Sequence, residues 1–383
     1  MPIFDAVLIG AGFAGAVTAR QLAELGNLRV LLLERRGHIA GNAYDCKDAA
    51  DILIHQYGPH IFHTNNQRVF DYLSRFTKWR DYQHRVVANV HGALMPVPFN
   101  LTSLSLAFGA EKGAQLKEKL LAAYGAEKKV TILELRQSDD ADLSLVADYI
   151  YENVFLHYTM KQWDTTPENI DPDTTARVPV FLSLDDRYFQ DTYQGMPAAG
   201  YTKLFENLLA HPNITTALNC PAETRLTLKD GQILLDGEAF SGPVVYTGAV
   251  DELFSCRFGR LPYRTLDFQF ETHARAQYQS HATVNYTVSE EFTRITEFKQ
   301  LTGEIHPEKT SIVKEYSRAY DGSAGSVPYY AIISPENKAL YDSYKALADN
   351  YPNLHLLGRL AEYQYYNMDA ITLKALELCD RLL

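Results

Sequence analysis

The chain has 383 residues, of which 46% are hydrophobic and 22% are charged, a mixture that excludes a disordered, collagen-like or coiled-coil protein. This length favours two to three domains. The formal net charge is −11, and a surface of that sign repels nucleic acid and anionic lipid at long range, although a local basic pocket can still bind a small anion. We therefore expect neither nucleic-acid binding nor membrane insertion.

The four cysteines, at positions 46, 220, 256 and 379, form no CxxC pair and have no histidines at metal-ligand spacing. We therefore expect reduced thiols, no metal site and a cytoplasmic location. The longest uncharged run, residues 6–19, is shorter than the roughly 20 residues that a membrane helix needs. Because Asp5 rather than a basic residue precedes this run, it is also a poor signal peptide.

The chain opens with the pattern of a strand, a helix and a second strand. Residues 6–9 and 30–33 are short apolar runs, and residues 16–25 have helical spacing and end before Gly26. Apolar runs of this length are typical of strands buried on both faces of a parallel sheet. Residues 6–33 are therefore predicted to form a βαβ unit.

A glycine turn lies between the first strand and the helix of this unit. In Gly10-Ala11-Gly12-Phe13-Ala14-Gly15, Gly10 permits a tight bend, Gly12 lets a pyrophosphate approach the backbone, and Gly15 lets the helix pack on the strand. Glu34 follows the second strand, 22 residues after Gly12, where a carboxylate can accept hydrogen bonds from ribose hydroxyls. The pattern favours a dinucleotide site over a turn that binds nothing.

The remaining segments predict a mixed α/β protein. Residues 101–136 and 142–158 have helical spacing, residues 282–288 and 310–316 resemble antiparallel strands, and the apolar runs 243–248 and 354–358 could return to the first sheet. We expect three parts: a discontinuous dinucleotide-binding Rossmann-like α/β domain (1–80, 191–250 and 331–383), a helical insert (100–174) and an antiparallel sheet that lines a substrate cleft (81–99, 175–190 and 251–330).

Two stretches favour FAD over NAD as the dinucleotide. Residues 34–42 resemble the continuation of the glycine turn in FAD proteins of the amine oxidase and desaturase group, with Ala40 in place of their first paired glycine. Residues 358–382 resemble that group's closing segment, in which a helix N-terminus faces the flavin and favours negative charge on its reduced form. The residues expected to bind FAD are Gly10, Gly12, Phe13, Gly15, Glu34, Arg35, Gly41, Asn42, Tyr57, His60, Arg359, Met368 and Asp369.

Six further strings narrow the family. They are YGPHIFHT at 57–64, YTMKQW at 158–163, YQGMP at 193–197, YRTLD at 263–267, TRITE at 293–297 and KEYSR at 314–318. Each alone is compatible with ordinary core or rim residues. In series they resemble the UDP-galactopyranose mutase family, and the likeness extends from residue 6 to about residue 375.

The resemblance implies a flavin-dependent isomerase that interconverts UDP-galactopyranose and UDP-galactofuranose without net oxidation and supplies galactofuranose for cell-surface glycans. Reduced FAD is thought to attack the anomeric carbon through its N5 atom, forming a covalent flavin–galactose adduct and releasing UDP, which later returns. NADPH or NADH is the expected reductant, and a homodimer is the expected assembly. UDP-N-acetylgalactopyranose and UDP-arabinopyranose stay open as further substrates.

By the same resemblance, Arg177 and Arg294 hold the diphosphate, and His60 and His63 lie beside the flavin as further catalytic residues. Trp163 lies in a segment that forms a mobile lid in the family. The residues expected to bind substrate are Phe155, Tyr158, Thr159, Trp163, Arg177, Tyr188, Asn285, Arg294, Tyr330, Tyr365 and Asn367.

Two positions depart from the family pattern. His84 stands where relatives carry asparagine, and Asn367 stands where some carry aspartate. A flavin amine oxidase or desaturase is the alternative enzyme, which would have an apolar or amine-binding cleft. A non-catalytic nucleotide-sugar binding protein is the third alternative, and the intact glycine turn is evidence against it.

Overall fold

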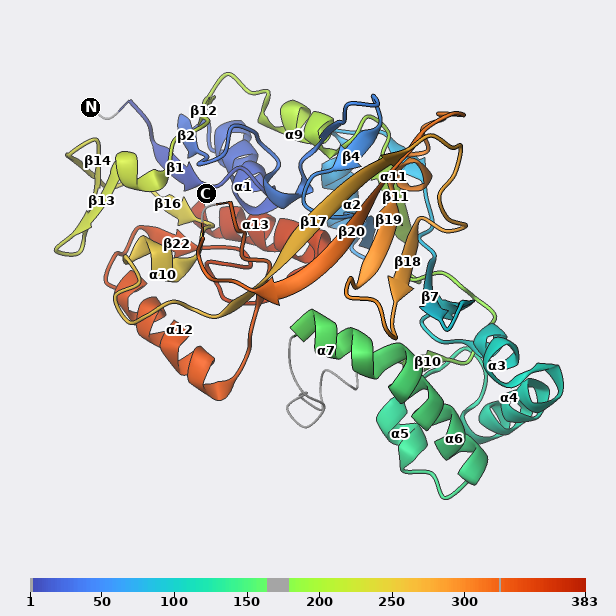
Figure 1. Ribbon diagram of the computed structural model, residues 1–383. Coiled ribbons are helices and arrows are strands. Elements are labelled where there is room, and N and C mark those ends of the chain that lie inside the picture. The colour runs from blue at the N-terminus through green and yellow to red at the C-terminus, as the bar shows by residue number, and fades with distance from the viewer. Residues whose placement is uncertain (1–2, 164–178, 324) are drawn as a thin grey trace.

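The computed structural model describes residues 3–163, 179–323 and 325–383. The first strand of the chain belongs to a five-stranded parallel sheet (Figure 1) with the order β12-β2-β1-β16-β22. Its strands are β12 (Ile214–Ala217), β2 (Val30–Leu33), β1 (Ala6–Ile9), β16 (Val244–Tyr246) and β22 (Leu354–Leu356). Helices α1 (Phe13–Glu24) and α13 (Met368–Leu382) pack side by side against this sheet (Figure 1).

The opening βαβ unit and the return of two distant strands to its sheet are therefore confirmed. Strands β1 and β2 pair in parallel from Ala6 and Val30 onward, and β16 lies between β1 and β22. The four strand residues of β1 are all buried, as are those of β2. Burial on both faces explains why these segments are continuous apolar runs rather than alternating ones.

A second, seven-stranded sheet has the order β21-β17-β20-β19-β18-β7-β8. Its strands are β21 (Tyr330–Ala331), β17 (Tyr263–His273), β20 (Thr310–Ala319), β19 (Arg294–Glu297), β18 (Thr283–Tyr286), β7 (Val86–Val90) and β8 (Ala93–Val97). The predicted antiparallel sheet is confirmed with one exception, because β7 pairs with β18 in parallel. These two strands are joined through the long intervening chain, so no hairpin forces them to run in opposite directions.

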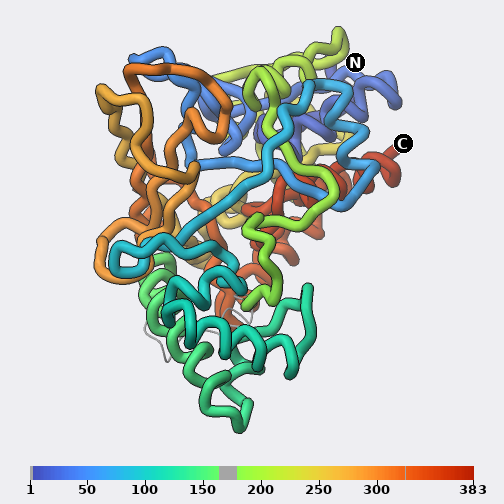
Figure 2. The backbone as a smooth tube through the Cα atoms, turned by 90° about the vertical axis from the view of Figure 1, so that its right-hand side faces the viewer, coloured from blue at the N-terminus to red at the C-terminus, as the bar shows by residue number. Residues whose placement is uncertain are grey.

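A helical segment forms one end of the molecule (Figures 1 and 2). It contains α3 (Leu101–Phe108), α4 (Ala110–Tyr124), α5 (Ile132–Arg136), α6 (Ala141–Ile150), a π-helical stretch (Tyr151–Leu156) and α7 (His157–Trp163). These elements enclose their own apolar core. The segment is not entirely helical, because β9 (Lys129–Thr131) pairs with β10 (Pro179–Phe181).

Shorter elements connect these parts. They are β3 (Asp45–Lys47), β4 (Leu53–His55), β5 (Phe62–Thr64), α2 (Gln67–Ser74), β6 (Trp79–Asp81), β11 (Tyr193–Pro197), α9 (Tyr201–Leu209), β13 (Leu226–Lys229), β14 (Gln232–Leu235), β15 (Glu238–Phe240), α10 (Val250–Leu253), α11 (Phe298–Thr302) and α12 (Pro335–Ala348). In the described part of the chain, no helix has both the length and the apolar character needed to cross a membrane.

Candidate functional site

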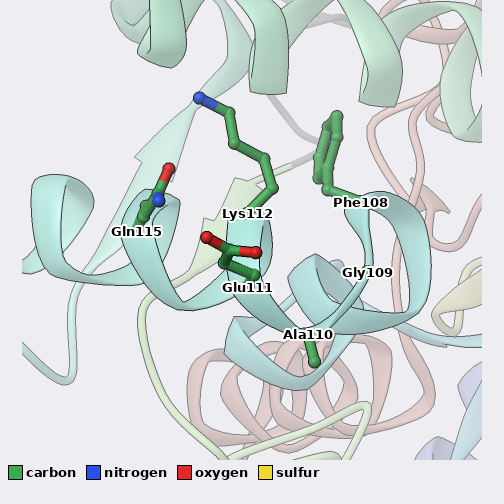
Figure 3. Close-up of a pocket in the computed structure, with 6 residues that line it drawn as sticks. All are labelled: Phe108, Gly109, Ala110, Glu111, Lys112 and Gln115. Atoms are coloured by element: carbon green, nitrogen blue, oxygen red, sulfur yellow. The ribbon is translucent and has the colours of Figure 1, made fainter.

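Two hollows differ in size and chemistry. The smaller, about 450 Å³, lies where α3 meets α4 and is lined by short stretches of these two helices around Gly109 (Figure 3). The larger, about 1090 Å³, is lined by residues of the seven-stranded sheet, of α7 and α12, and of the start of α13. The larger cavity brings together these residues that the sequence singled out: Asn42, Tyr57, His60, His63, Tyr158, Trp163, Tyr188, Asn285, Arg294, Tyr330, Arg359, Tyr365, Asn367 and Met368.

The dinucleotide end of the site is built on the N-terminus of α1. Gly10 has φ of +96°, and a Cβ on Gly41 would lie only 2.9 Å from the Cα of Gly12, so two backbone segments pass closely in front of the helix. Gly12 caps α1 without a side-chain hydrogen bond, which leaves first-turn N–H groups available to an anion. Ala40, where the FAD group has glycine, has φ of 74°, a conformation that glycine adopts without strain.

Glu34 holds this turn together from the end of β2. Its buried carboxylate accepts hydrogen bonds from the backbone N–H of Ala11 and of Arg36, each at 2.8 Å. Each carboxylate oxygen can accept more than one hydrogen bond, so Glu34 can also receive ribose hydroxyls.

Of the two consecutive arginines that follow Glu34, the second faces the site. Arg35 is 57% exposed and pairs with Glu252 on the surface. The Arg36 guanidinium lies 4.3 Å from the ring centroid of Tyr57, donates to the Asn42 side chain, and has a buried Nη1 that bonds to no group in the described residues. Arg36 is therefore a candidate cofactor ligand that the sequence analysis missed in favour of Arg35.

Two partly buried histidines line the cavity. The His60 ring lies 2.9 Å from the Gly58 carbonyl, and burial lowers the pKa of His60 to about 3. His63 contacts the Asp191 carboxylate at 3.1 Å and stacks on Phe189 with centroids 3.6 Å apart. His60 is thus a neutral group with a fixed ring, and His63 is held in place by two contacts.

His84 is a third cavity histidine. It contacts the Tyr82 hydroxyl at 3.0 Å, and its backbone carbonyl accepts from the Tyr188 N–H. Burial, together with the positive charge of Arg294, lowers the pKa of His84 to about 3. At neutral pH this departure from the family pattern therefore adds a neutral imidazole, not a charge.

The far wall of the cavity is a row of polar side chains across three neighbouring strands. The sheet register places Asn285 of β18 opposite Arg294 of β19, and Arg294 opposite Glu315 of β20. The Arg294 Nε donates to Glu315 at 2.9 Å, and Glu315 is 1% exposed whereas Arg294 is 24% exposed. Burial raises the pKa of Glu315, and Arg294 opposes that effect.

This row has unused hydrogen-bonding capacity. Asn285 Oδ1 and Glu315 Oε1 are buried and accept no hydrogen bond from the described residues. Buried polar atoms in native proteins normally have partners, so these atoms indicate a polar ligand or ordered water in the cavity. Glu315 was missed as a site residue because its pairing depends on strand register, which the sequence string alone does not give.

Aromatic residues form the remaining wall. Tyr330 stacks on Tyr365 with centroids 6.0 Å apart, and Trp163 lies 6.4 Å from Tyr330. Burial raises the pKa of Tyr330 to about 12, so its hydroxyl stays a hydrogen-bond donor at neutral pH. The Arg359 guanidinium lies 4.4 Å from the Tyr365 ring, which places a second cation beside these phenols.

Not every residue expected at the site lines the cavity. Phe155 is buried in the core of the helical segment, and Thr159 is buried on α7 outside the cavity wall. Glu34 and Asp369 also lie outside the cavity wall. Glu34 accepts a hydrogen bond from the Ala11 backbone N–H, and Asp369 accepts one from the Thr64 hydroxyl at 2.9 Å. Arg177 lies outside the described residues.

These features define the class of the protein: a dinucleotide-binding α/β protein whose second sheet forms a polar, tyrosine-rich cavity. Residues 8–76 match the NAD(P)-binding Rossmann-like domain family, and residues 153–365 match the UDP-galactopyranose mutase family. In the described residues, no cluster of His, Cys, Asp or Glu side chains could hold a metal ion.

Curated relatives match almost the whole chain. It is 37% identical to the UDP-galactopyranose mutase of Mycoplasma pneumoniae, over 99% of this chain and 96% of that protein. It is 35% identical to a probable UDP-galactopyranose mutase of Klebsiella pneumoniae, over 98% and 94% respectively. It is 34% identical to a dTDP-fucopyranose mutase of Escherichia coli, over 97% and 96%. The chain belongs to the UDP-galactopyranose mutase family.

Solved structures agree on the fold. A reduced UDP-galactopyranose mutase superimposes with a TM-score of 0.72 at 15% identity, covering 100% of this chain and 94% of that one. A putative protoporphyrinogen oxidase from Exiguobacterium gives 0.64 at 13% identity, covering 100% and 99%. The predicted fold class and the family resemblance are both confirmed.

Proposed function

We propose that this chain is a flavin-dependent mutase that interconverts UDP-galactopyranose and UDP-galactofuranose. The observation that carries the proposal is the cavity in which Asn42 and Tyr57, both in contact with Arg36, face the row of Asn285, Arg294 and Glu315. A redox cofactor site and a polar, cation-containing sugar-nucleotide site thus open into the same space. The names of the relatives at 35–37% identity support the same reaction.

The residues present fit FAD. The uncapped N-terminus of α1 can receive the pyrophosphate, Glu34 can receive the ribose, and the unpartnered Nη1 of Arg36 can donate to the cofactor. Asn367, the N-cap of α13, makes no side-chain capping bond, so this helix end also offers free N–H groups and a dipole that favours negative charge. When bound and reduced, FAD supplies the nucleophile for the anomeric carbon of the sugar.

The protein's own residues bind and orient the substrate. Arg294, held by Glu315, presents its remaining N–H groups to the diphosphate, and Arg177 is expected to do the same. The hydroxyls of Tyr188, Tyr330 and Tyr365 donate to phosphate oxygens, and Tyr158 and Trp163 offer apolar faces to the base. The neutral ring of His60 and the ring of His63, both on the cavity wall, hold the reacting sugar or cofactor by hydrogen bonds.

Three further properties belong to the proposal: NADPH or NADH as the reductant, a homodimer, and a cytoplasmic location. The division into a discontinuous FAD domain, a helical insert and a substrate sheet is also part of it.

The test follows the conversion of the five-membered to the six-membered sugar ring under anaerobic conditions. UDP-galactofuranose is incubated with the holoenzyme, with and without dithionite, and UDP-galactopyranose is measured by chromatography. We expect turnover only with reduced flavin and no consumption of reductant in proportion to product. Full activity with oxidised flavin, or one equivalent of reductant used per product, would overturn the mutase mechanism, whereas transfer of one electron pair from the substrate per turnover would favour the amine oxidase or desaturase alternative.

A second candidate substrate is dTDP-fucopyranose. The relative named for that substrate is 34% identical over 97% of the chain, close to the values for the UDP-galactopyranose mutases. Comparing kcat/KM for UDP-galactopyranose and dTDP-fucopyranose on the same reduced enzyme distinguishes the two. A preference for UDP-galactopyranose supports the first proposal, and the reverse preference supports the second.

A further inference from the structure

Helix α7 connects the helical segment to the cavity. Together α6, the π-helical stretch and α7 form a continuous helical run from Ala141 to Trp163 that reaches towards the two sheets (Figure 1). In the π-helical stretch the Asn153 carbonyl accepts a hydrogen bond from the Thr287 hydroxyl at 2.6 Å. π-helical turns are rare and occur frequently at functional sites. The run ends with Tyr158, Gln162 and Trp163 on the cavity wall.

Lys161, one turn after Tyr158, reaches across to the second sheet. Its Nζ donates to the backbone carbonyls of Tyr286 at 2.5 Å, Glu290 at 2.9 Å and Phe292 at 3.4 Å. An ammonium group has three donors and no acceptor, so these three carbonyls satisfy it completely. Tyr286 is the last residue of β18, and Glu290 and Phe292 lie in the turn that joins β18 to β19.

The end of α7 has a second attachment to the same sheet. The Gln162 carbonyl accepts from the Ser317 hydroxyl of β20 at 2.7 Å and from the Arg264 Nε of β17 at 3.1 Å. The last carbonyls of a helix lack intrahelical partners, and a cation near them is stabilising. This contact fixes the helix end, whereas Lys161 fixes the helix to the hairpin.

The hairpin that receives Lys161 carries two residues of the cavity wall. Tyr286 directly follows Asn285, and Phe292 lies two residues before Arg294. One ammonium therefore connects the helix that bears Tyr158 and Trp163 to the strands that bear Asn285 and Arg294. These two groups face the same cavity from different sides.

We propose that Lys161 is a positioning residue that fastens α7 to the β18–β19 hairpin and so sets the spacing between the aromatic and cationic walls of the nucleotide site. The inference rests on the proposed function for the identity of the ligand, a pyrimidine nucleoside diphosphate. Within the described residues the Lys161 ammonium donates to backbone carbonyls, and Lys161 does not line the cavity in which the chemistry takes place. Its loss should therefore weaken nucleotide binding and raise KM more than it lowers kcat.

The primary variant is Lys161→Met, which keeps the length of the side chain and removes its three donors. Binding of UDP and of dTDP to the holoenzyme is followed by the change in flavin absorbance. We expect Kd to rise at least tenfold and kcat at saturating substrate to stay within about threefold of the parent. Amide hydrogen exchange of residues 157–163 in the nucleotide-free protein should become at least tenfold faster.

Lys299 provides a matched control. Its Nζ also donates to backbone carbonyls, those of Ala276 at 2.8 Å and His306 at 2.5 Å, and the residue is 8% exposed but does not line the cavity. Lys299→Met should lower stability without changing the Kd for UDP or exchange in residues 157–163. If Lys161→Met does not fold, Lys161→Gln, which keeps two donors, replaces it, and Lys161→Arg should partly restore binding.

Two results would overturn the proposal. One is a Lys161→Met protein with nucleotide Kd and exchange of residues 157–163 within twofold of the parent. The other is an equal loss of nucleotide affinity in Lys299→Met, because general destabilisation would then explain both. If the parent itself binds neither UDP nor dTDP, the proposed function fails, and the exchange measurement still decides whether Lys161 holds α7.

Discussion

Arg294 and Glu315 form an ion pair across β19 and β20, and substitution of Arg294 by lysine separates two roles of the arginine. One role is to neutralise Glu315, whose carboxylate is 1% exposed. The other is to present a planar fork of N–H groups to the diphosphate. Lysine preserves the first role because it keeps the positive charge, but it cannot reproduce the fork.

The expected magnitudes differ between the two roles. Loss of a charge-assisted bidentate contact in a closed site costs about 2–4 kcal/mol of transition-state stabilisation. At 1.36 kcal/mol per factor of ten, this is a fall of roughly 30- to 900-fold in kcat/KM for Arg294→Lys. The free energy of unfolding should change by only about 1 kcal/mol, because Glu315 keeps a cationic partner.

Arg294→Met provides the contrast. It leaves a buried carboxylate unpaired, which costs about 3–5 kcal/mol of stability. Adding Glu315→Met should recover that stability, because an apolar pair of similar volume is often neutral or stabilising, but it should not recover activity.

The assay combines steady-state kinetics of the reduced enzyme with urea unfolding of each variant. If kcat/KM of Arg294→Lys stayed within threefold of the parent, Arg294 would not hold the diphosphate through a fork. If Arg294→Met were as stable as the parent, the buried pair would not have the cost assigned to it. Arg177→Lys is expected to lose activity by a similar factor, on the family resemblance.

Three further outcomes are expected. Gly12→Val should purify with little flavin, because a side chain at the N-terminus of α1 occupies the space through which the pyrophosphate approaches; full flavin content by absorbance, with an unchanged circular dichroism spectrum, would contradict this. In a Trp79→Phe background, UDP should change the emission of Trp163, which lines the cavity, whereas unchanged emission at saturating UDP would count against closure of this segment over the nucleotide. The free energy of unfolding should fall as pH drops from 7 to 5. Burial lowers the pKa values of His55, His60 and His84 in the folded protein to about 4, 3 and 3, whereas a histidine in the unfolded chain has its ordinary pKa of about 6.5. Below that ordinary pKa the unfolded chain binds more protons than the folded one, and the slope approaches about 1.4 kcal/mol per pH unit for each histidine. Urea unfolding midpoints that do not change over this range would refute that reasoning, and His84→Asn should reduce the slope.

The sequence was sufficient where local pattern decides structure. The apolar runs at 6–9 and 30–33 have the same bounds as β1 and β2, because a strand buried on both faces needs every residue to be apolar. The helix after the glycine turn begins at Phe13 rather than Ala16. Gly12 is the N-cap and Gly15 lies in the first turn of the helix, so helical spacing is visible only after these glycines.

Features that depend on contacts between residues far apart in the sequence could not be predicted from local pattern. Arg35 and Arg36 are chemically identical neighbours, and only the position of Tyr57 and Asn42 shows which one faces the site. The contact between Arg294 and Glu315 depends on the register of β19 against β20. Phe155 was expected at the nucleotide because it lies near Tyr158, but it faces the core of the helical segment instead.

Selectivity among sugar nucleotides has to lie in side chains rather than in the fold. Relatives named for UDP-galactopyranose and for dTDP-fucopyranose are 34–37% identical to this chain over nearly its whole length, so one backbone supports both. Lys161 of α7 is attached to backbone carbonyls of the hairpin. These carbonyls are present whichever side chains the hairpin residues carry. The cavity wall can therefore keep its spacing while individual residues change. His84 and Asn367 both face the cavity, so a change of side chain at either position can alter which hydroxyls a sugar must offer without disturbing Arg294 or the dinucleotide end.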